Sequence, residues 1–305
     1  MMNAPVALFV YNRPLHTRRT LMSLSMCSEA KETNLFIFCD GLKNGATDEV
    51  KKSVEEVRKV IREKKWCRNV EIIESPVNKG LSRSVVAGVT DIVNRFGKII
   101  VLEDDMEVSP FFLKFMNEGL ALYEHDDAVI SLTGYCWPVK DKIPETFFLL
   151  GTYCWGWATW KRGWDLFDAD GRKLLQQLEE KNLTSLFDFD GSHFYTRMLK
   201  DQVEGKNDSW ALPWYAAAFL QNKLTLIPGR SLVRNTGIDG TGVHSGKSDE
   251  WAVELTTTPV VVARIPPEDS IQGREAVTAF FRSMKRNSLP ERLKRKIRSF
   301  FPQNN

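Results

Sequence analysis

The chain has 305 residues, of which 43% are hydrophobic and 27% charged, with a formal net charge of +3. This length can bury a sizeable core, as one large α/β domain or as a domain with a substrate-binding extension. No run approaches the roughly 20 apolar residues of a membrane-spanning helix, and no basic segment precedes the first apolar run, so we expect no signal peptide. The five cysteines include no CxxC pair, so we expect neither a disulfide framework nor a zinc site, and a cytoplasmic protein.

Short apolar runs followed by polar or glycine residues predict buried parallel strands, because runs without alternation suit strands covered on both faces. In chain order they are Val6–Val10, Leu35–Cys39, a weaker Val70–Glu74, and Lys98–Leu102. Helical patterns lie between them at His16–Cys27, Asp48–Lys64 and Leu81–Phe96. The alternation predicts an α/β fold with a mostly parallel central sheet flanked by helices, in which ligands bind beyond the carboxyl ends of the strands.

Three consecutive carboxylates, Glu103-Asp104-Asp105, follow the last of these strands. Carboxylates at the end of a buried strand repel one another and resist burial, so something must compensate their charge. Mg²⁺ or Mn²⁺ would do so, because these cations prefer oxygen ligands and often bind through one or two carboxylates plus substrate phosphates. The alternative is that Asp104 or Asp105 caps a helix that begins near Ser109-Pro110.

The Glu-Asp-Asp segment resembles the DxD-type motif of glycosyltransferases with the GT-A fold. The first half of the chain also resembles the family-2-like pattern of these enzymes, in the segments Tyr11-Asn12-Arg13-Pro14, Cys39-Asp40-Gly41 and Asn78-Lys-Gly-Leu-Ser-Arg83. The resemblance implies a single GT-A-like domain, with a Rossmann-like half that binds a nucleotide sugar. UDP is the favoured nucleotide by the same analogy.

The resemblance also implies roles for single residues. Asp40 would hold the base, Asp104 would face the ribose or the sugar, and Asp105 would bind the metal. The other residues of the nucleotide-sugar site would be Tyr11, Asn12, Arg13, Asn78, Gly80, Arg83 and Glu103. Arg83 has a reason of its own, because a guanidinium at a helix start suits phosphate. The alternatives are that Arg83 is a solvated helix residue and that the Asn-Lys-Gly segment is only a turn.

The run from Tyr153 to Trp164 is rich in aromatic residues and interrupted by glycine. Trp155 and Trp157 flank Gly156, which would let the backbone approach a bound sugar while the rings stack on it. The alternative is a tryptophan-rich segment that buries its face against the sheet, and we expect this for Trp160 and Trp164. Trp210 is a further candidate for the acceptor site.

The segments Asp208-Ser-Trp-Ala-Leu-Pro-Trp214 and Pro228 to His244, together with Trp-Gly-Trp-Ala-Thr-Trp, resemble bacterial glycosyltransferases of cell-surface polysaccharide assembly. The resemblance spans roughly Pro5 to His244. Transfer with inversion needs a general base, and we predict Asp208, with Asp239 in reserve. Asp208 could instead cap the helix that leads into Trp214. His244 would complete metal or phosphate binding, although an isolated loop histidine can also be simply solvated.

The C-terminal segment is strongly basic, with eight basic residues and one acidic residue between Arg282 and Arg298. Pro290–Phe301 can form an amphipathic helix that lies on an anionic membrane surface, which would suit a lipid-linked acceptor. No nucleic-acid-binding signature accompanies the charge, so we expect no nucleic acid partner. A solvated C-terminus is the alternative.

These observations predict an inverting glycosyltransferase that depends on Mn²⁺ or Mg²⁺ and acts on a glycan or lipid-linked glycan. The nucleotide-sugar-binding half would comprise residues 1–107, the acceptor half residues 108–281, and the basic tail residues 282–305. One alternative is a sugar nucleotidyltransferase, which usually has a glycine-rich phosphate loop after the first strand, whereas the segment here contains no glycine. The other alternative is a catalytically silent protein that binds a carbohydrate or a nucleotide.

Overall fold

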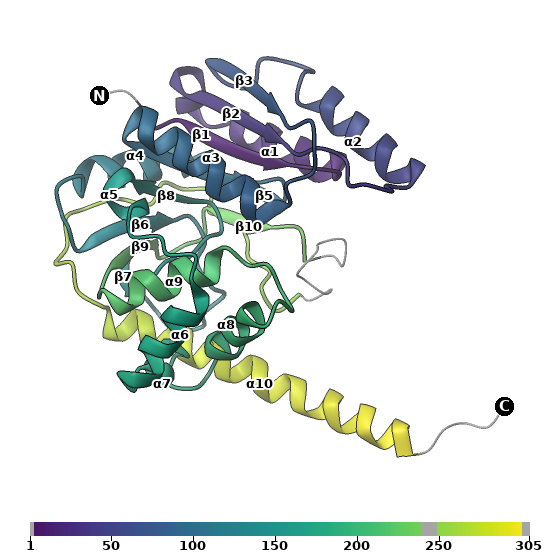
Figure 1. Cartoon of the computed structure of the whole chain (residues 1–305). Coiled ribbons are helices and arrows are strands. Elements are labelled where there is room, and N and C mark those ends of the chain that lie inside the picture. Colours follow the sequence, from purple (N-terminus) through teal and green to yellow (C-terminus); the bar gives the residue numbers. More distant parts are fainter. Residues whose placement is uncertain (1–2, 239–248, 301–305) are drawn as a thin grey trace.

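A sheet of eight strands occupies the centre of the computed structural model, which describes residues 3–238 and 249–300, with side chains up to residue 285 (Figure 1). In spatial order the strands are β3 (Asn69–Glu74), β2 (Asn34–Cys39), β1 (Val6–Val10), β4 (Lys98–Glu103), β8 (Trp157–Trp160), β6 (Val129–Thr133), β9 (Leu224–Pro228) and β7 (Thr146–Leu150). The four strands predicted from the first hundred residues are therefore adjacent in the sheet.

Six of these strands run in one direction. The pairings of β3, β2, β1 and β4 are parallel, whereas β8 is antiparallel to both β4 and β6, and β7 is antiparallel to β9. The predicted fold class, an α/β domain with a mostly parallel central sheet, is confirmed. The carboxyl ends of β1, β2, β3, β4, β6 and β9 consequently lie at one edge of the sheet.

Helices cover both faces of the sheet (Figure 1). Apolar side chains of α1, α2 and α4 pack against one face, and those of α3, together with tryptophans from β8, α5 and the start of α9, pack against the other. The helices are α1 (Pro14–Ser25), η1 (Ser28–Glu32), α2 (Asp48–Val60), α3 (Leu81–Phe96), α4 (Phe112–Leu122), α5 (Lys161–Trp164), α6 (Gly171–Glu180), α7 (Thr184–Phe187), α8 (Tyr195–Val203), α9 (Ala211–Leu220) and α10 (Ile271–Phe300).

The helix boundaries have local causes. α1 begins at Pro14 because the fixed φ of proline suits the first helical turn, where no intrahelical N–H bond is lost. α3 has the bounds that its valine and isoleucine spacing predicts, and it ends where Gly97 adopts a φ of +75°. α2 ends at Val60, four residues before the predicted end, and its last turn contains Arg58 and Lys59.

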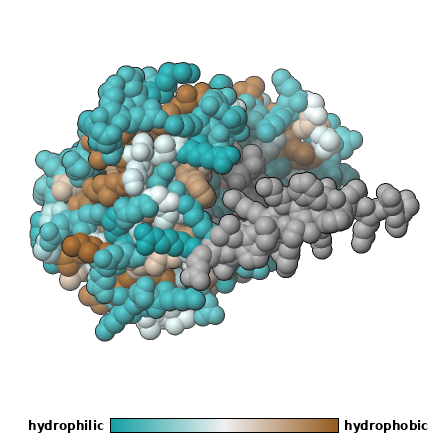
Figure 2. Space-filling view, turned by 90° about the horizontal axis from the view of Figure 1, so that it is seen from below, coloured by the Kyte–Doolittle hydropathy of each residue, from teal (hydrophilic) through white to brown (hydrophobic). Residues whose placement is uncertain are grey.

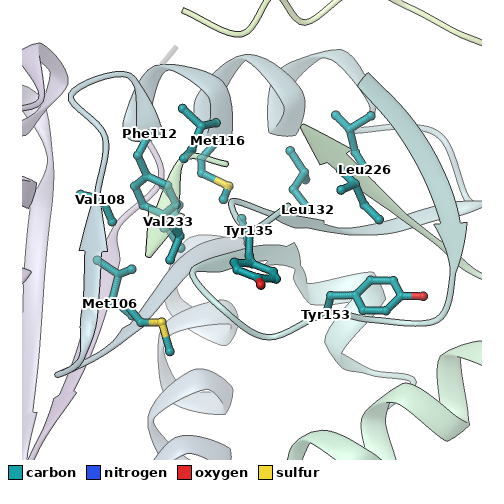
Figure 3. Packing of buried hydrophobic residues seen from close by; sticks show 14 of the residues in the cluster. Met106, Val108, Phe112, Met116, Leu132, Tyr135, Tyr153, Leu226 and Val233 are labelled. Atoms are coloured by element: carbon teal, nitrogen blue, oxygen red, sulfur yellow. The ribbon is translucent and has the colours of Figure 1, made fainter. Parts of the chain in front are cut away.

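A second, two-stranded sheet joins distant parts of the chain beside β4. β5 (Met106–Val108) pairs antiparallel with β10 (Val233–Asn235), so that Met106 lies opposite Asn235. Figure 3 shows Val233 next to Phe112 of α4, with Met106 and Val108 close by. This core holds β10 against the segment that follows the three carboxylates.

α10 leaves the body of the protein and continues past it (Figure 1). Its first half is anchored, because Val277 and Phe281 are buried. The helix runs without a break through the predicted boundary at residue 282, so the backbone of the basic segment is helical up to Phe300. In the face shown in Figure 2, hydrophilic residues surround scattered hydrophobic ones. Within residues 3–238 and 249–300, no helix combines the length and apolar character needed to cross a membrane.

Candidate functional site

The predicted site residues of the first half gather at the carboxyl edge of the sheet. Val10 is in register with Cys39, and Phe9 is in register with Glu103, so Tyr11, Asp40 and Asp104 follow three neighbouring strand ends. β8 runs the other way and begins at this edge, which brings the Trp155–Gly156 segment alongside the end of β4. The residues predicted for the donor half and the Trp155–Gly156 segment predicted for the acceptor half thus lie along the same edge of the sheet.

Arg13 supplies the positive charge at the acidic strand end. Its Nη2 donates to Asp104 Oδ1 and, at 2.8 Å, to Asp105 Oδ2, and its Nε lies 3.4 Å from Asp104 Oδ2. The sequence predicted a metal ion for this role, and this contact was missed because the two segments are far apart in the chain. The alternative, that Asp104 or Asp105 caps a helix, is wrong. The chain continues from Asp105 into β5, and it is Ser109 that accepts hydrogen bonds from the N–H groups at the start of α4.

The carboxylates are hard to ionise here. Burial, together with the charges of Asp105 and Asp104, raises the pKa of Glu103 to about 8. Burial also raises the pKa of Asp104 to about 6, against the opposing effect of Arg13. One guanidinium therefore compensates the three carboxylates only in part, so the site favours a further cation or a proton.

Three buried polar atoms at this edge have no hydrogen-bond partner among the described residues: Tyr11 Oη, Arg13 Nη1 and Asp105 Oδ1. Buried polar groups are normally paired, so such atoms call for an explanation. Asp105 is only 8% exposed. A ligand with both acceptor oxygens and positive charge, such as a metal-bound diphosphate, would satisfy Arg13 and Asp105 together.

These residues fit a divalent cation that takes most of its ligands from outside the protein. Asp105 Oδ1 is one carboxylate oxygen without a partner, whereas the oxygens of Asp104 contact Arg13. Within the described part of the chain, no group of three or more His, Cys, Asp or Glu residues is arranged to hold a metal. Mg²⁺ in enzymes commonly has this sparse protein coordination, with phosphates and water as the other ligands.

Asp40 holds the loop before α3. Its Oδ1 accepts bonds from the N–H groups of Gly41 (2.9 Å) and Lys79 (2.8 Å), and its Oδ2 accepts one from Gly80 (2.9 Å). Asn78 Nδ2 donates to the Gly41 carbonyl at 2.8 Å, which closes the same connection from the other side. Asp40 and Asn78 thereby fix the loop 75–80 as a wall beside the end of β2, a role that the sequence did not predict.

The remaining predicted residues of this half lie around that wall. Gly80 has a φ of +78° as the residue before α3, a conformation that glycine adopts without strain. Arg83 is exposed in the first turn of α3 and forms no ion pair within the described residues. Asn12 is half-buried at the same edge. Arg83 is therefore placed to meet an anion at a helix start.

The segment after β10 covers Arg13 and Asp105. Thr236 donates to the Asp105 carbonyl through both its N–H (2.8 Å) and its Oγ1 (3.0 Å). A Cβ on Gly237 would lie 2.0 Å from Asp105 Oδ2 and 2.9 Å from Arg13 Nη1, so only glycine fits there. The Asn-Thr-Gly pattern was visible in the sequence, but its position over the carboxylates was not. Asp239 and His244, the reserve base and the predicted third ligand, lie outside the described residues.

Two of the predicted acceptor residues belong to the core. Trp157 is fully buried, and Trp210 is 5% exposed. The ring of Trp157 lies 4.5 Å from that of Trp214, 5.4 Å from that of Trp210 and 5.9 Å from that of Trp164, measured between centroids. The prediction that Trp157 and Trp210 stack on a sugar is wrong, because other rings and α3 cover them. Trp160 and Trp164 are buried, as predicted.

Trp155 remains available at the edge. It is half-buried, and its ring makes edge contacts with Tyr135 at 4.5 Å and with Trp251 at 5.5 Å. Gly156 is packed tightly, since a Cβ there would lie 2.6 Å from Val233 Cγ2. Trp251, also half-buried, was not predicted, because it stands alone in the sequence. Trp155 and Trp251 form the aromatic surface of this edge.

Asp208 is exposed just before α9. Trp210 and Trp214 of that segment contact Trp157, the first residue of β8, so the start of α9 lies near the same edge of the sheet. The hydroxyl of Ser209 approaches the N–H of Leu212 at 3.4 Å. The structure thus places the predicted base on the side of the sheet where the other site residues lie.

No protein-family model and no curated protein matches the sequence. Many solved structures are similar over part of the chain, and two of them illustrate the similarity. A UDP-glucose pyrophosphorylase complexed with UDP-glucose covers 54% of this chain and 79% of its own, at 12% identity and a TM-score of 0.30. A protein provisionally named nucleotide-diphospho-sugar transferase, from Desulfovibrio desulfuricans G20, covers 55% and 69% at 10% identity and a TM-score of 0.31. At such scores neither similarity decides the function.

Proposed function

We propose that this protein is a GT-A-type, family-2-like glycosyltransferase that moves a sugar from a nucleotide diphosphate, UDP being favoured, to a glycan or lipid-linked glycan. The observation that carries the proposal is the pair Arg13 and Asp105 at the carboxyl edge of parallel strands, each with a buried polar atom that has no partner among the described residues. Ligands of open α/β sheets bind at this edge. A diphosphate meets Arg13, and a phosphate-bound cation meets Asp105.

The two halves of the chain would divide the work. Residues 1–107 would bind the nucleotide sugar, with Asp40 and Asn78 shaping the base pocket and Arg83 reaching the phosphates. Residues 108–281 would bind the acceptor, with a sugar ring lying against Trp155 and Trp251. Asp208 would deprotonate the acceptor hydroxyl as it attacks the anomeric carbon from the side opposite the leaving diphosphate.

The proposed cation is Mn²⁺ or Mg²⁺, held by Asp105 and the donor phosphates. When bound, it would stabilise the charge that develops on the departing nucleotide diphosphate. Arg13 and Arg83 would bind phosphate oxygens, and Tyr11 would donate or accept one hydrogen bond through its unpartnered hydroxyl. The basic segment, residues 282–305, would bring the enzyme to an anionic membrane that carries a lipid-linked acceptor.

The identity of the products tests this proposal. The protein would be incubated with UDP-glucose and related nucleotide sugars, Mn²⁺ and a panel of glycan acceptors, with and without pyrophosphate. Glycosyl transfer releases UDP and does not need pyrophosphate, whereas a nucleotidyltransferase would form UTP and a sugar 1-phosphate only when pyrophosphate is present. UTP formation would contradict the proposal, and binding without any turnover would support the silent binding protein.

A further inference from the structure

The contact between Arg13 and Asp105 leaves hydrogen-bonding capacity on both side chains. Arg13 Nη2 donates to Asp105 Oδ2 at 2.8 Å, while Arg13 Nη1 and Asp105 Oδ1 are buried without partners in the described part of the chain. The two side chains are 19% and 11% exposed. Each side chain therefore keeps one buried hydrogen-bonding atom that the contact between them does not use.

A divalent cation on Asp105 would conflict with this contact. The guanidinium already lies at hydrogen-bond distance from the carboxylate, and two like charges so close together, away from bulk water, repel strongly. Removing Arg13 from the carboxylates without a replacement is also unfavourable, because a buried charge would be left unpaired. Phosphate oxygens are a suitable replacement, since they match the guanidinium geometry as well as a carboxylate does.

The main chain of Arg13 need not move for such an exchange. Its carbonyl accepts bonds from Thr17 N (3.0 Å) and Thr17 Oγ1 (2.9 Å), which fix it at the start of α1. On the other side, Thr236 fixes the Asp105 carbonyl. Both backbones are anchored, so rotation of the Arg13 side chain alone would separate the two groups.

We propose that Arg13 couples metal binding to nucleotide binding. Without nucleotide, its guanidinium donates hydrogen bonds to Asp104 and Asp105 and its charge keeps a divalent cation away from them. When a nucleotide diphosphate binds, the guanidinium moves to the phosphate oxygens, which frees Asp105 for the cation. This inference rests on the proposed function, because it takes a nucleotide diphosphate as the ligand. Arg13 is thus a positioning residue that sets the order of ligand binding.

The test is the affinity for Mn²⁺, measured from the paramagnetic resonance signal of free Mn²⁺ with and without UDP, and corrected with protein-free mixtures of Mn²⁺ and UDP. Wild type should bind Mn²⁺ about tenfold or more tightly when UDP is present. Arg13→Gln should bind Mn²⁺ without UDP about tenfold more tightly than wild type does, and UDP should raise its Mn²⁺ affinity by a smaller factor than in wild type, because only the phosphate ligands then contribute. Arg95→Gln, at the far end of α3, removes an exposed arginine and should behave as wild type.

Two results would overturn the inference: equal Mn²⁺ affinity of wild type with and without bound UDP, or no gain in Mn²⁺ affinity in Arg13→Gln. If Arg13→Gln does not fold, Arg13→Met takes its place in the same comparison with wild type. UDP binding, followed separately by calorimetry without metal, distinguishes the two proposals. If UDP and other nucleotide diphosphates do not bind, the proposed function fails, and the comparison of Mn²⁺ affinities without nucleotide still decides whether Arg13 excludes the cation.

Discussion

The acidic end of β4 and the tryptophan cluster of β8, α5 and the start of α9 are close together, because β4 and β8 are neighbouring strands. They differ in how far solvent and ligands can reach them. In the cluster the indole N–H groups of Trp157 and Trp214 lack partners among the described residues, and both rings are fully buried. At the strand end the unpartnered atoms belong to Arg13 and Asp105, which carry charge and retain some exposure. A binding site requires unsatisfied polar groups and a route to them, and of these two regions the strand end is the one that combines unpartnered atoms with partial exposure.

The strongest test of this contrast is Trp157→Ala. Removing a fully buried indole should lower the free energy of unfolding by about 3–5 kcal/mol, because a cavity remains between α3 and α9. Urea denaturation measures it. Trp155→Ala is the matched control, and it should cost much less stability while it impairs acceptor use. If both variants lost equal stability, the division between core and surface tryptophans would be wrong.

The next test concerns the loop that Asp40 holds beside the end of β2. Asp40→Ala leaves three N–H groups without their charged acceptor, so we expect a loss of about 2–3 kcal/mol in the free energy of unfolding. Asp40→Asn should lose less, because one acceptor oxygen remains. The amide hydrogens of Lys79 and Gly80 should exchange faster in both variants. Unchanged exchange of these two amides would show that Asp40 does not hold the loop.

Gly237→Ala tests whether the segment after β10 covers Arg13 and Asp105. The added Cβ would overlap Asp105 Oδ2, so Thr236 and its neighbours must shift. We expect a loss of about 1–3 kcal/mol in stability, as for overpacked sites, with weaker nucleotide binding. Gly45→Ala is a control away from the site: a Cβ there meets nothing, and the strain of alanine at its φ of +74° should lower stability without weakening nucleotide binding. Nucleotide affinity equal to that of wild type in Gly237→Ala would contradict the proposed cover.

A further test is the dependence of stability on pH. The pKa of Glu103 rises from its ordinary 4.5 to about 8 on folding, so the folded state holds a proton that the unfolded state has lost between these values. Stability without ligands should therefore fall as the pH rises through this window and level off above it. Glu103→Gln removes this contribution. Urea denaturation at about pH 5 and about pH 8 checks it, and identical slopes in the two proteins would contradict it.

The local pattern of residues was sufficient to predict the four parallel strands and α3. The pairing of Arg13 with Asp104 depends on the register between β1 and β4, which no local pattern specifies. The burial of Trp157 depends on where α9 packs, more than fifty residues later in the chain. The clustering of the predicted residues at one edge was therefore predictable from strand ends, whereas the contact of Arg13 with the carboxylates and the partial exposure of Trp155 and Trp251 required the tertiary structure.

The central claim is that a nucleotide diphosphate binds at the carboxyl edge of the first four strands. Hydrogen exchange with and without UDP, and then other nucleotide diphosphates, in the presence of Mn²⁺ tests it directly. We predict protection in the segments 11–14, 40–41, 78–83 and 103–107, and none at the amino ends of the same strands. Protection confined to another part of the protein, or no protection by any nucleotide diphosphate, would contradict the claim.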